Sequence, residues 1–128
     1  MADLSKIQPG NWLRYIPENQ YCTFVSKADY IVVEGYNGQW NCFDDQLTYI
    51  RVSVDIFSLC KFIMDGAHWS KTTGAGIPLT ISYTDDKPYL HGTDTEAIYI
   101  PFVHTLQNAY AQLTGERLQP NLYGVHPS

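Results

Sequence analysis

Residues 29–43, DYIVVEGYNGQWNCF, contain the signal that decides the predicted fold. Two short runs rich in β-branched and aromatic residues, 29–36 and 38–43, flank the dipeptide Asn37-Gly38. Asparagine and glycine both adopt the positive φ angles that a type I′ turn requires, so the two runs are expected to pair as an antiparallel hairpin. The fold is therefore expected to be built on an antiparallel sheet.

Further short strand-like runs recur along the chain, separated by turn residues. They begin at Trp12 and continue at 21–26, 46–52, 77–84, 88–92 and 97–103. The runs in the first half predict a meander of four or five strands, and Asp85-Asp86-Lys87 predicts a second hairpin between 77–84 and 88–92. Such a meander must curl into a small barrel or lay one face on helices to bury its apolar side.

The apolar period changes after residue 53. The apolar residues that recur at the spacing of one helix face are Ile56, Phe57, Cys60, Ile63 and Met64. This spacing predicts a helix over 54–65, with Ser53 as its N-cap and Gly66 as its stop. The run YIRVSVDIF also alternates, so a continuation of the preceding strand remains an alternative here.

A second helix is predicted over 102–114, in FVHTLQNAYAQLTGERLQP. Its apolar side is formed by Val103, Leu106, Tyr110 and Leu113. Gly115 supplies the left-handed residue that commonly ends a helix. Together these elements predict one α+β domain over 7–118.

In that domain, a small antiparallel, barrel-like sheet of about six to eight short strands carries one or two packed helices. Residues 1–6 are expected to be a flexible N-terminus, and 119–128 a loosely held tail.

Composition limits the classes of partner. Eight basic residues oppose thirteen acidic ones, and the basic residues are scattered singly along the chain. Nucleic-acid binding and an anionic membrane surface are therefore disfavoured, because both draw affinity from clustered cations. Three cysteines without C-x-x-C spacing predict buried free thiols in a reducing compartment, and no long apolar run is present, so we expect a cytoplasmic protein.

The sequence near the end of the chain resembles that of a known group of proteins. FVHTLQNAYAQLTGERL is similar to the VHxLQNxYxxLTGExL ending of a group of small proteins from phages, prophages and mobile elements of Bacteroidetes-type bacteria. IQPGNWL at 7–13 resembles the opening motif of the same group, and the two matches cover about a fifth of the chain. Ala109 and Arg117 depart from the group's pattern. These proteins have no agreed activity, so the resemblance implies a phage setting and no catalytic residues.

Candidate site residues are few. His104, Gln107 and Asn108 lie on or beside the polar side of the predicted helix 102–114, where an imidazole and two amides could hold a small ligand or a partner's backbone. The alternative is a solvated helix side, or polar groups that fix the helix to its surroundings. Trp69, in a glycine-flanked loop, and Tyr36, beside the Asn-Gly turn, are expected at the surface as binding aromatics.

Other patterns predict no chemistry. The four histidines lack metal-ligand spacing, and the acidic clusters fall at predicted turns, where aspartate bonds its own backbone. We therefore expect no metal site, no cofactor and no catalytic residue.

The favoured hypothesis is a non-enzymatic binding module for a host or phage protein or a small molecule. The alternatives are a small enzyme that uses His104 or His91 with a carboxylate such as Asp94, and a structural component or homo-oligomer.

Overall fold

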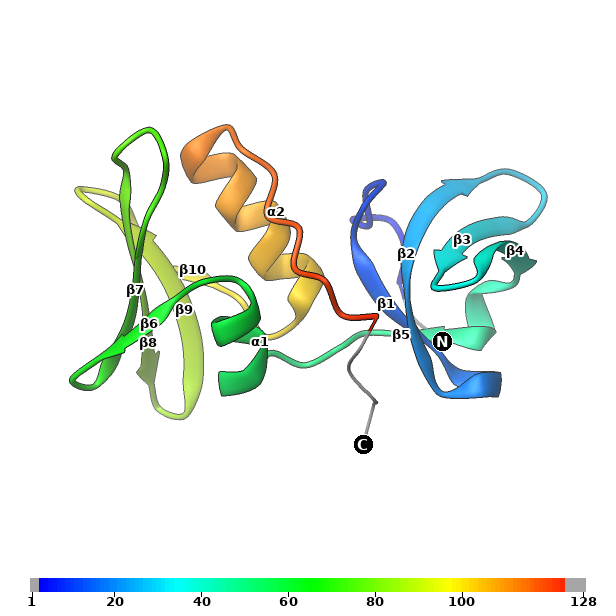
Figure 1. Ribbon diagram of the computed structural model, residues 1–128, viewed down its shortest axis with the longest axis horizontal. Coiled ribbons are helices and arrows are strands. Elements are labelled where there is room, and N and C mark those ends of the chain that lie inside the picture. The colour runs from blue at the N-terminus through cyan, green and yellow to red at the C-terminus, as the bar shows by residue number, and fades with distance from the viewer. Residues whose placement is uncertain (1–2, 124–128) are drawn as a thin grey trace. The chain divides into compact units, whose positions relative to one another are not determined.

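The computed structural model describes residues 3–123, which divide into two compact units with a five-stranded antiparallel sheet each (Figure 1). The first unit contains residues 3–50 and 121–123, and the second contains 51–120. This α+β class confirms the prediction, although we expected a single domain over 7–118.

The predicted barrel is wrong. Each sheet is open and ends in two edge strands, and the described residues form ten strands where six to eight were expected. The apolar strand positions are divided between two sheets, and each sheet buries one face in its own unit instead of closing on itself.

The first sheet has the strand order β4-β3-β2-β1-β5. Its strands are β1 (Trp12–Tyr15), β2 (Gln20–Lys27), β3 (Ile31–Gly35), β4 (Gly38–Cys42) and β5 (Leu47–Thr48). Short 3₁₀ turns follow β1 at Ile16–Glu18 and β4 at Asp44–Gln46. Strand β4 therefore lies at an edge of the sheet, paired only with β3 among the described strands.

The predicted hairpin over 29–43 is present as β3 and β4, but its turn differs. Gly35 pairs with Gly38, so the two loop residues are Tyr36 and Asn37. Only Gly38, with a φ of 118°, has a positive φ at this turn. The predicted type I′ turn is therefore wrong, because that turn needs positive φ at both of its central residues.

The chain before β1 belongs to the core of the first unit. Leu4 and Ile7 are buried with Leu13, Cys22 and Val33 in one apolar cluster. The hydroxyl of Tyr49 also donates a hydrogen bond to the carbonyl of Asp3. Within the predicted flexible N-terminus, Leu4 is thus packed in this core while Asp3, Ser5 and Lys6 are exposed, and residues 1 and 2 lie outside the described range.

The start of the predicted loose tail is packed as well. Leu122 is fully buried, and the ring of Tyr123 lies edge-on to Trp12 with centroids 4.8 Å apart. Apolar burial of these two side chains holds residues 121–123 in the first unit, which corrects the prediction for this part of 119–128. Residues 124–128 lie outside the described range.

The second sheet has the strand order β10-β9-β8-β7-β6. The elements of this unit are α1 (Val54–Leu59), β6 (Ile63–Asp65), β7 (His68–Thr72), β8 (Pro78–Thr84), β9 (Lys87–Gly92), β10 (Ile98–Tyr99) and α2 (Val103–Thr114). Both helices lie on one side of the sheet in Figure 1. The buried residues Leu79, Ile81 and Leu90 alternate with more exposed ones along β8 and β9, as expected for a sheet with one face in the core.

The helix predicted over 54–65 is half as long as expected. Ser53 caps it as predicted, accepting a hydrogen bond from the amide of Ile56, but α1 ends at Leu59 and 63–65 form strand β6. Ile63 and Met64 are exposed, so they are not part of the helix's buried side. Gly66, predicted to stop the helix, lies with a positive φ in the turn between β6 and β7.

The second predicted helix is present as α2. Gly115, with a φ of 73°, ends it as expected, and its amide donates to the carbonyl of Ala111. At the start, the hydroxyl of Thr105 accepts a hydrogen bond from the amide of Phe102. Residue 102 is thus the N-cap rather than the first helical residue, a difference of one position.

Candidate functional site

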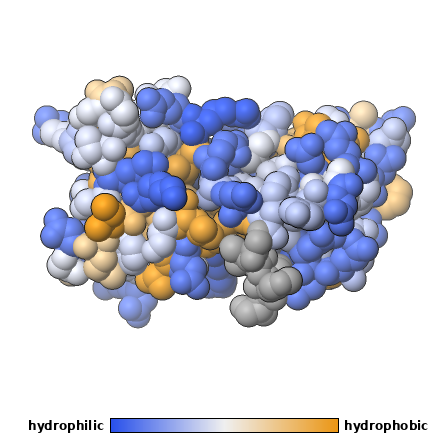
Figure 2. Space-filling view, in the orientation of Figure 1, coloured by the Kyte–Doolittle hydropathy of each residue, from blue (hydrophilic) through white to orange (hydrophobic). Residues whose placement is uncertain are grey.

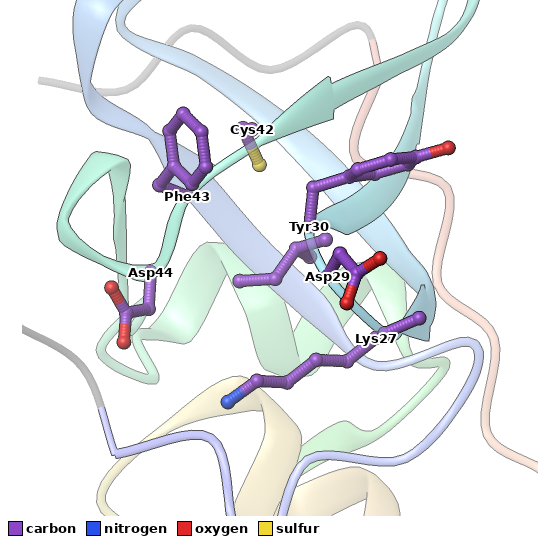
Figure 3. A pocket seen from close by; sticks show the side chains of 8 residues that line it. Lys27, Asp29, Tyr30, Cys42, Phe43 and Asp44 are labelled. Atoms are coloured by element: carbon purple, nitrogen blue, oxygen red, sulfur yellow. The ribbon is translucent and has the colours of Figure 1, made fainter.

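A small pocket of about 130 Å³ opens at one end of the first sheet (Figure 3). It lies between the turn that joins β2 to β3 and the end of β4. The lining residues are Lys27, Ala28, Asp29, Tyr30, Ile31, Cys42, Phe43 and Asp44.

Strand pairing brings the two walls of the pocket together. Ile31, the first residue of β3, pairs with Cys42, the last residue of β4. On one side, the amide of Ala28 donates to the carbonyl of Tyr30 and closes the β2–β3 turn. The backbone on both sides of the pocket is therefore set by hydrogen bonds of the protein itself.

The wall after β4 is held by a reciprocal pair of hydrogen bonds. The amide of Phe43 donates to the side-chain oxygen of Gln46 over 2.9 Å, and the amide of Gln46 donates to the carbonyl of Phe43 over 3.0 Å. These bonds fix the backbone while the ring of Phe43 stays 62% exposed. An aromatic ring on a rigid backbone loses little conformational entropy when it binds.

Two buried side chains and two aromatic rings form the apolar part of the pocket lining. Ile31 and Cys42 are buried, and burial raises the pKa of the Cys42 thiol, so both side chains are uncharged at neutral pH. Phe43 and the half-exposed Tyr30 lie on two sides of Cys42 in Figure 3. Such a site can bring one small apolar group into contact with an aromatic ring and buried apolar side chains.

The pocket lining also contains charged side chains. Lys27, Asp29 and Asp44 also line the pocket, which gives its rim one positive and two negative charges. The two carboxylates favour a positively charged group beside whatever enters the pocket.

Two of the three predicted helix residues lie in the interior of the second unit. Gln107 is buried, and its side-chain amide donates to the carbonyl of Leu118 over 3.0 Å. His104 is only 5% exposed, its ring is stacked on Phe102, and burial lowers its pKa to about 4. Asn108 is half-buried.

The segment that ends at Pro120 returns along α2, so the side of the helix that we expected to be open is covered (Figure 1). His104, Gln107 and Asn108 all lie on α2. The hydrogen bond from Gln107 to Leu118 fixes the helix to the rest of its unit.

The two predicted surface aromatics differ from each other. Trp69 lies in β7, is 9% exposed and packs against Phe57 with ring centroids 5.6 Å apart, so its predicted exposure is wrong. The segment expected to be a loop pairs as a strand, and pairing turns this indole to the core side. Tyr36 is 77% exposed in the β3–β4 turn, at the surface as expected, with its ring edge-on to Tyr123.

The residues considered for an enzyme lie at different places in the second unit. His91 lies in β9, 3.4 Å from the hydroxyl of Ser82, and Asp94 lies in the following loop with a positive φ. Over residues 3–123, no group of three or more histidine, cysteine or acidic side chains is placed to hold a metal ion.

The pocket residues Tyr30 and Phe43 were not singled out from the sequence. The available signal was the hairpin itself, because the ends of paired strands bring residues just outside them together. Apolar surface is visible between hydrophilic residues on both units in Figure 2, so exposure alone does not mark one site.

None of the helices in the described range is long and apolar enough to cross a bilayer. The chain was also compared with known proteins: no family model, no curated protein and no solved structure matches it.

Proposed function

We propose that this protein is a non-enzymatic interaction module whose first unit binds an extended segment of a partner protein. The observation that carries the proposal is the pocket lined by Tyr30 and Phe43, which combines the buried side chains of Ile31 and Cys42 with two exposed rings on a hydrogen-bonded backbone.

The size of the pocket favours a side chain over a metabolite. Pockets for small molecules commonly have volumes of ~300–1,000 Å³, whereas a cavity of ~150 Å³ holds a single benzene-sized group. At about 130 Å³, this pocket accommodates one side chain the size of leucine or phenylalanine. A partner anchored by one such residue would use the site as a binding hot spot.

The edge strand β4 offers a backbone with which a partner strand can pair. β4 forms one edge of the first sheet and leads directly into the pocket at Cys42 and Phe43. An added strand can pair with the open edge of a sheet, its backbone giving affinity while a side-chain pocket gives specificity. The expected partner is therefore an extended peptide with one apolar anchor, next to a lysine or arginine that faces Asp29 and Asp44.

The proposed setting is a phage or mobile element acting in the cytoplasm of a host cell, with a host or phage protein as the partner. It rests on the similarity of LQNAYAQLTGE and IQPGNWL to the motifs of that protein group. The scattered basic residues speak against nucleic acid as the partner.

A random-peptide selection against the full chain tests this function. Selected peptides are synthesised, and their Kd values are measured by fluorescence anisotropy for the wild type, Phe43→Ala and Tyr36→Ala. We expect an apolar anchor flanked by basic residues, and a loss of affinity of about tenfold in Phe43→Ala.

Tyr36→Ala tests the other exposed aromatic of the same hairpin, which does not line the pocket, so a larger loss in Tyr36→Ala than in Phe43→Ala would place the partner on the turn instead. Both variants replace exposed side chains, and unchanged melting temperatures would show that their folds are intact. The function is wrong if no peptide is selected, or if Phe43→Ala binds the selected peptides as tightly as the wild type.

A further inference from the structure

The face of the second sheet opposite α1 and α2 carries a continuous set of hydroxyl groups. Cross-strand partners point to the same face of a sheet, and the register aligns Ser70 with Thr80, Thr80 with His91, and Ser82 with Tyr89. None of these residues is buried, whereas their neighbours Leu79, Ile81 and Leu90 face the core.

A hollow of about 370 Å³ lies on this face, within the size range of small-molecule sites. Its lining residues are Ser82, Thr84, Tyr89, His91, Thr95 and Ala97. The strands β8 and β9 supply the first four, and the loop before β10 supplies the last two.

Several of these groups are held in place. The hydroxyl of Ser82 lies 3.4 Å from Nε2 of His91, and the hydroxyl of Thr95 accepts a 2.7 Å hydrogen bond from the amide of Gly92. The ring of Tyr89 packs on Tyr99 with centroids 5.5 Å apart and an interplanar angle of 40°. The hollow therefore presents one supported aromatic ring beside a row of hydroxyl groups and one imidazole.

The chemistry of this lining selects among ligand classes. No lysine, arginine, aspartate or glutamate lines the hollow, so it offers no opposite charge to a phosphate, a carboxylate or an amine. Each hydroxyl both donates and accepts hydrogen bonds, and an imidazole has one ring nitrogen for each role when neutral. A purely apolar ligand would cover these groups without satisfying them, which is costly.

A neutral sugar has the complementary groups. The hydroxyls of a pyranose ring donate and accept in alternation along its edge, and its C–H face is apolar and packs on aromatic rings. We propose that this hollow is a binding site for a neutral hexose of a glycan, with Tyr89 beneath the ring and with Ser82 and His91 hydrogen-bonded to its hydroxyls. The site is independent of the peptide-binding pocket proposed for the first unit.

Titration of the full chain with neutral oligosaccharides, followed by amide chemical-shift changes, tests this site. The probes are maltotetraose, cellotetraose and mannotetraose, with adenosine and inorganic phosphate as the ligands of other classes. At least one oligosaccharide should saturate with a Kd in the millimolar range or below, and its shifts should centre on β8 and β9. Ser82→Ala and His91→Ala should each weaken that Kd at least fivefold.

Two further variants separate binding from folding. Thr72→Ala changes a hydroxyl on the same sheet outside the hollow and should have no effect. Phe43→Ala should also bind the sugar normally, so failure of the peptide site leaves this test intact. The inference is overturned if none of the three oligosaccharides saturates, if only adenosine or phosphate binds, or if the Ser82 and His91 variants bind as the wild type does.

Discussion

The indole ring of Trp40 lies directly over the Cα of Gly35 in the β3–β4 hairpin. A Cβ atom added to Gly35 would collide with the Cζ3 and Cη2 atoms of that ring. The ring is also held from another side by Tyr15, edge-on with centroids 5.2 Å apart, so it cannot move away without losing this contact. Gly35 is therefore required for its lack of a side chain rather than for an unusual backbone conformation.

Gly35→Ala should destabilise the protein by about 1–3 kcal/mol, the usual cost of forcing an extra methyl group into a packed site. Urea unfolding followed by tryptophan fluorescence measures this loss. Gly74→Ala is the matched control, because a Cβ there meets no atom within 4 Å and the backbone lacks a positive φ. Equal stability of the two variants would contradict the packing of Trp40 on Gly35.

The β8–β9 turn should accept a stabilising replacement. Asp85 and Asp86 have φ values of 53° and 63°, and Thr84 pairs with Lys87 across them, as in a type I′ turn. Asn-Gly suits such a turn better, so the double variant Asp85→Asn, Asp86→Gly should gain about 0.5–1 kcal/mol of unfolding free energy. Thermal unfolding measures the gain, and Asp86→Ala should instead lower the melting temperature because alanine disfavours a positive φ.

The three cysteines should be inert in the folded protein. Cys22, Cys42 and Cys60 are buried, and burial raises the pKa of Cys22 and of Cys60 to about 12. Because only the thiolate attacks a disulfide reagent, all three thiols should react slowly with DTNB at pH 8 and rapidly in urea. Rapid labelling of the folded protein would show that these side chains are accessible.

The free energy of unfolding should also fall as the pH rises above about 9, because the thiols of the unfolded chain then ionise and those of the folded chain do not.

Helix caps and hairpin turns could be predicted from the identities of a few neighbouring residues. Gly115 ends α2, Ser53 caps α1, and Asp85-Asp86 forms a hairpin turn, because caps and turns depend on the backbone preferences of one or two residues. The end of α1 could not be found in this way. Ile63 and Met64 fit a helical period, and their pairing with β7 depends on a strand that the sequence suggested was a loop.

The candidate pocket was missed for a similar reason. A type I′ turn centred on Asn37-Gly38 would pair Ile31 with Asp44, whereas the observed turn pairs Ile31 with Cys42. This register places Phe43 just beyond the paired strands, at the pocket. Burial likewise depends on partners distant in sequence: Trp69 packs on Phe57, whose position relative to Trp69 the local pattern does not determine.

His104 should make the folded protein sensitive to mild acid. Its folded-state pKa is about 4, below the usual value of 6.5, because burial disfavours the charged imidazolium. The unfolded chain therefore binds this proton at a higher pH than the folded chain does, and the proton favours unfolding. The stability linked to His104 should be fully present above pH 6.5 and be lost progressively as the pH falls from 6.5 to 4.

His104→Asn should reduce that dependence, because asparagine has no proton to gain. Over the full window the linked loss in the wild type is about 3 kcal/mol, from 1.36 kcal/mol per pKa unit. Urea unfolding at several pH values from 4 to 7 measures the slope for each protein. Asn108→Ala, on the same helix, is the control for packing: it should shift the unfolding free energy by a similar amount at every pH. If His104→Asn kept the wild-type slope, the acid sensitivity would belong to other groups and the imidazole would not be buried in its neutral form.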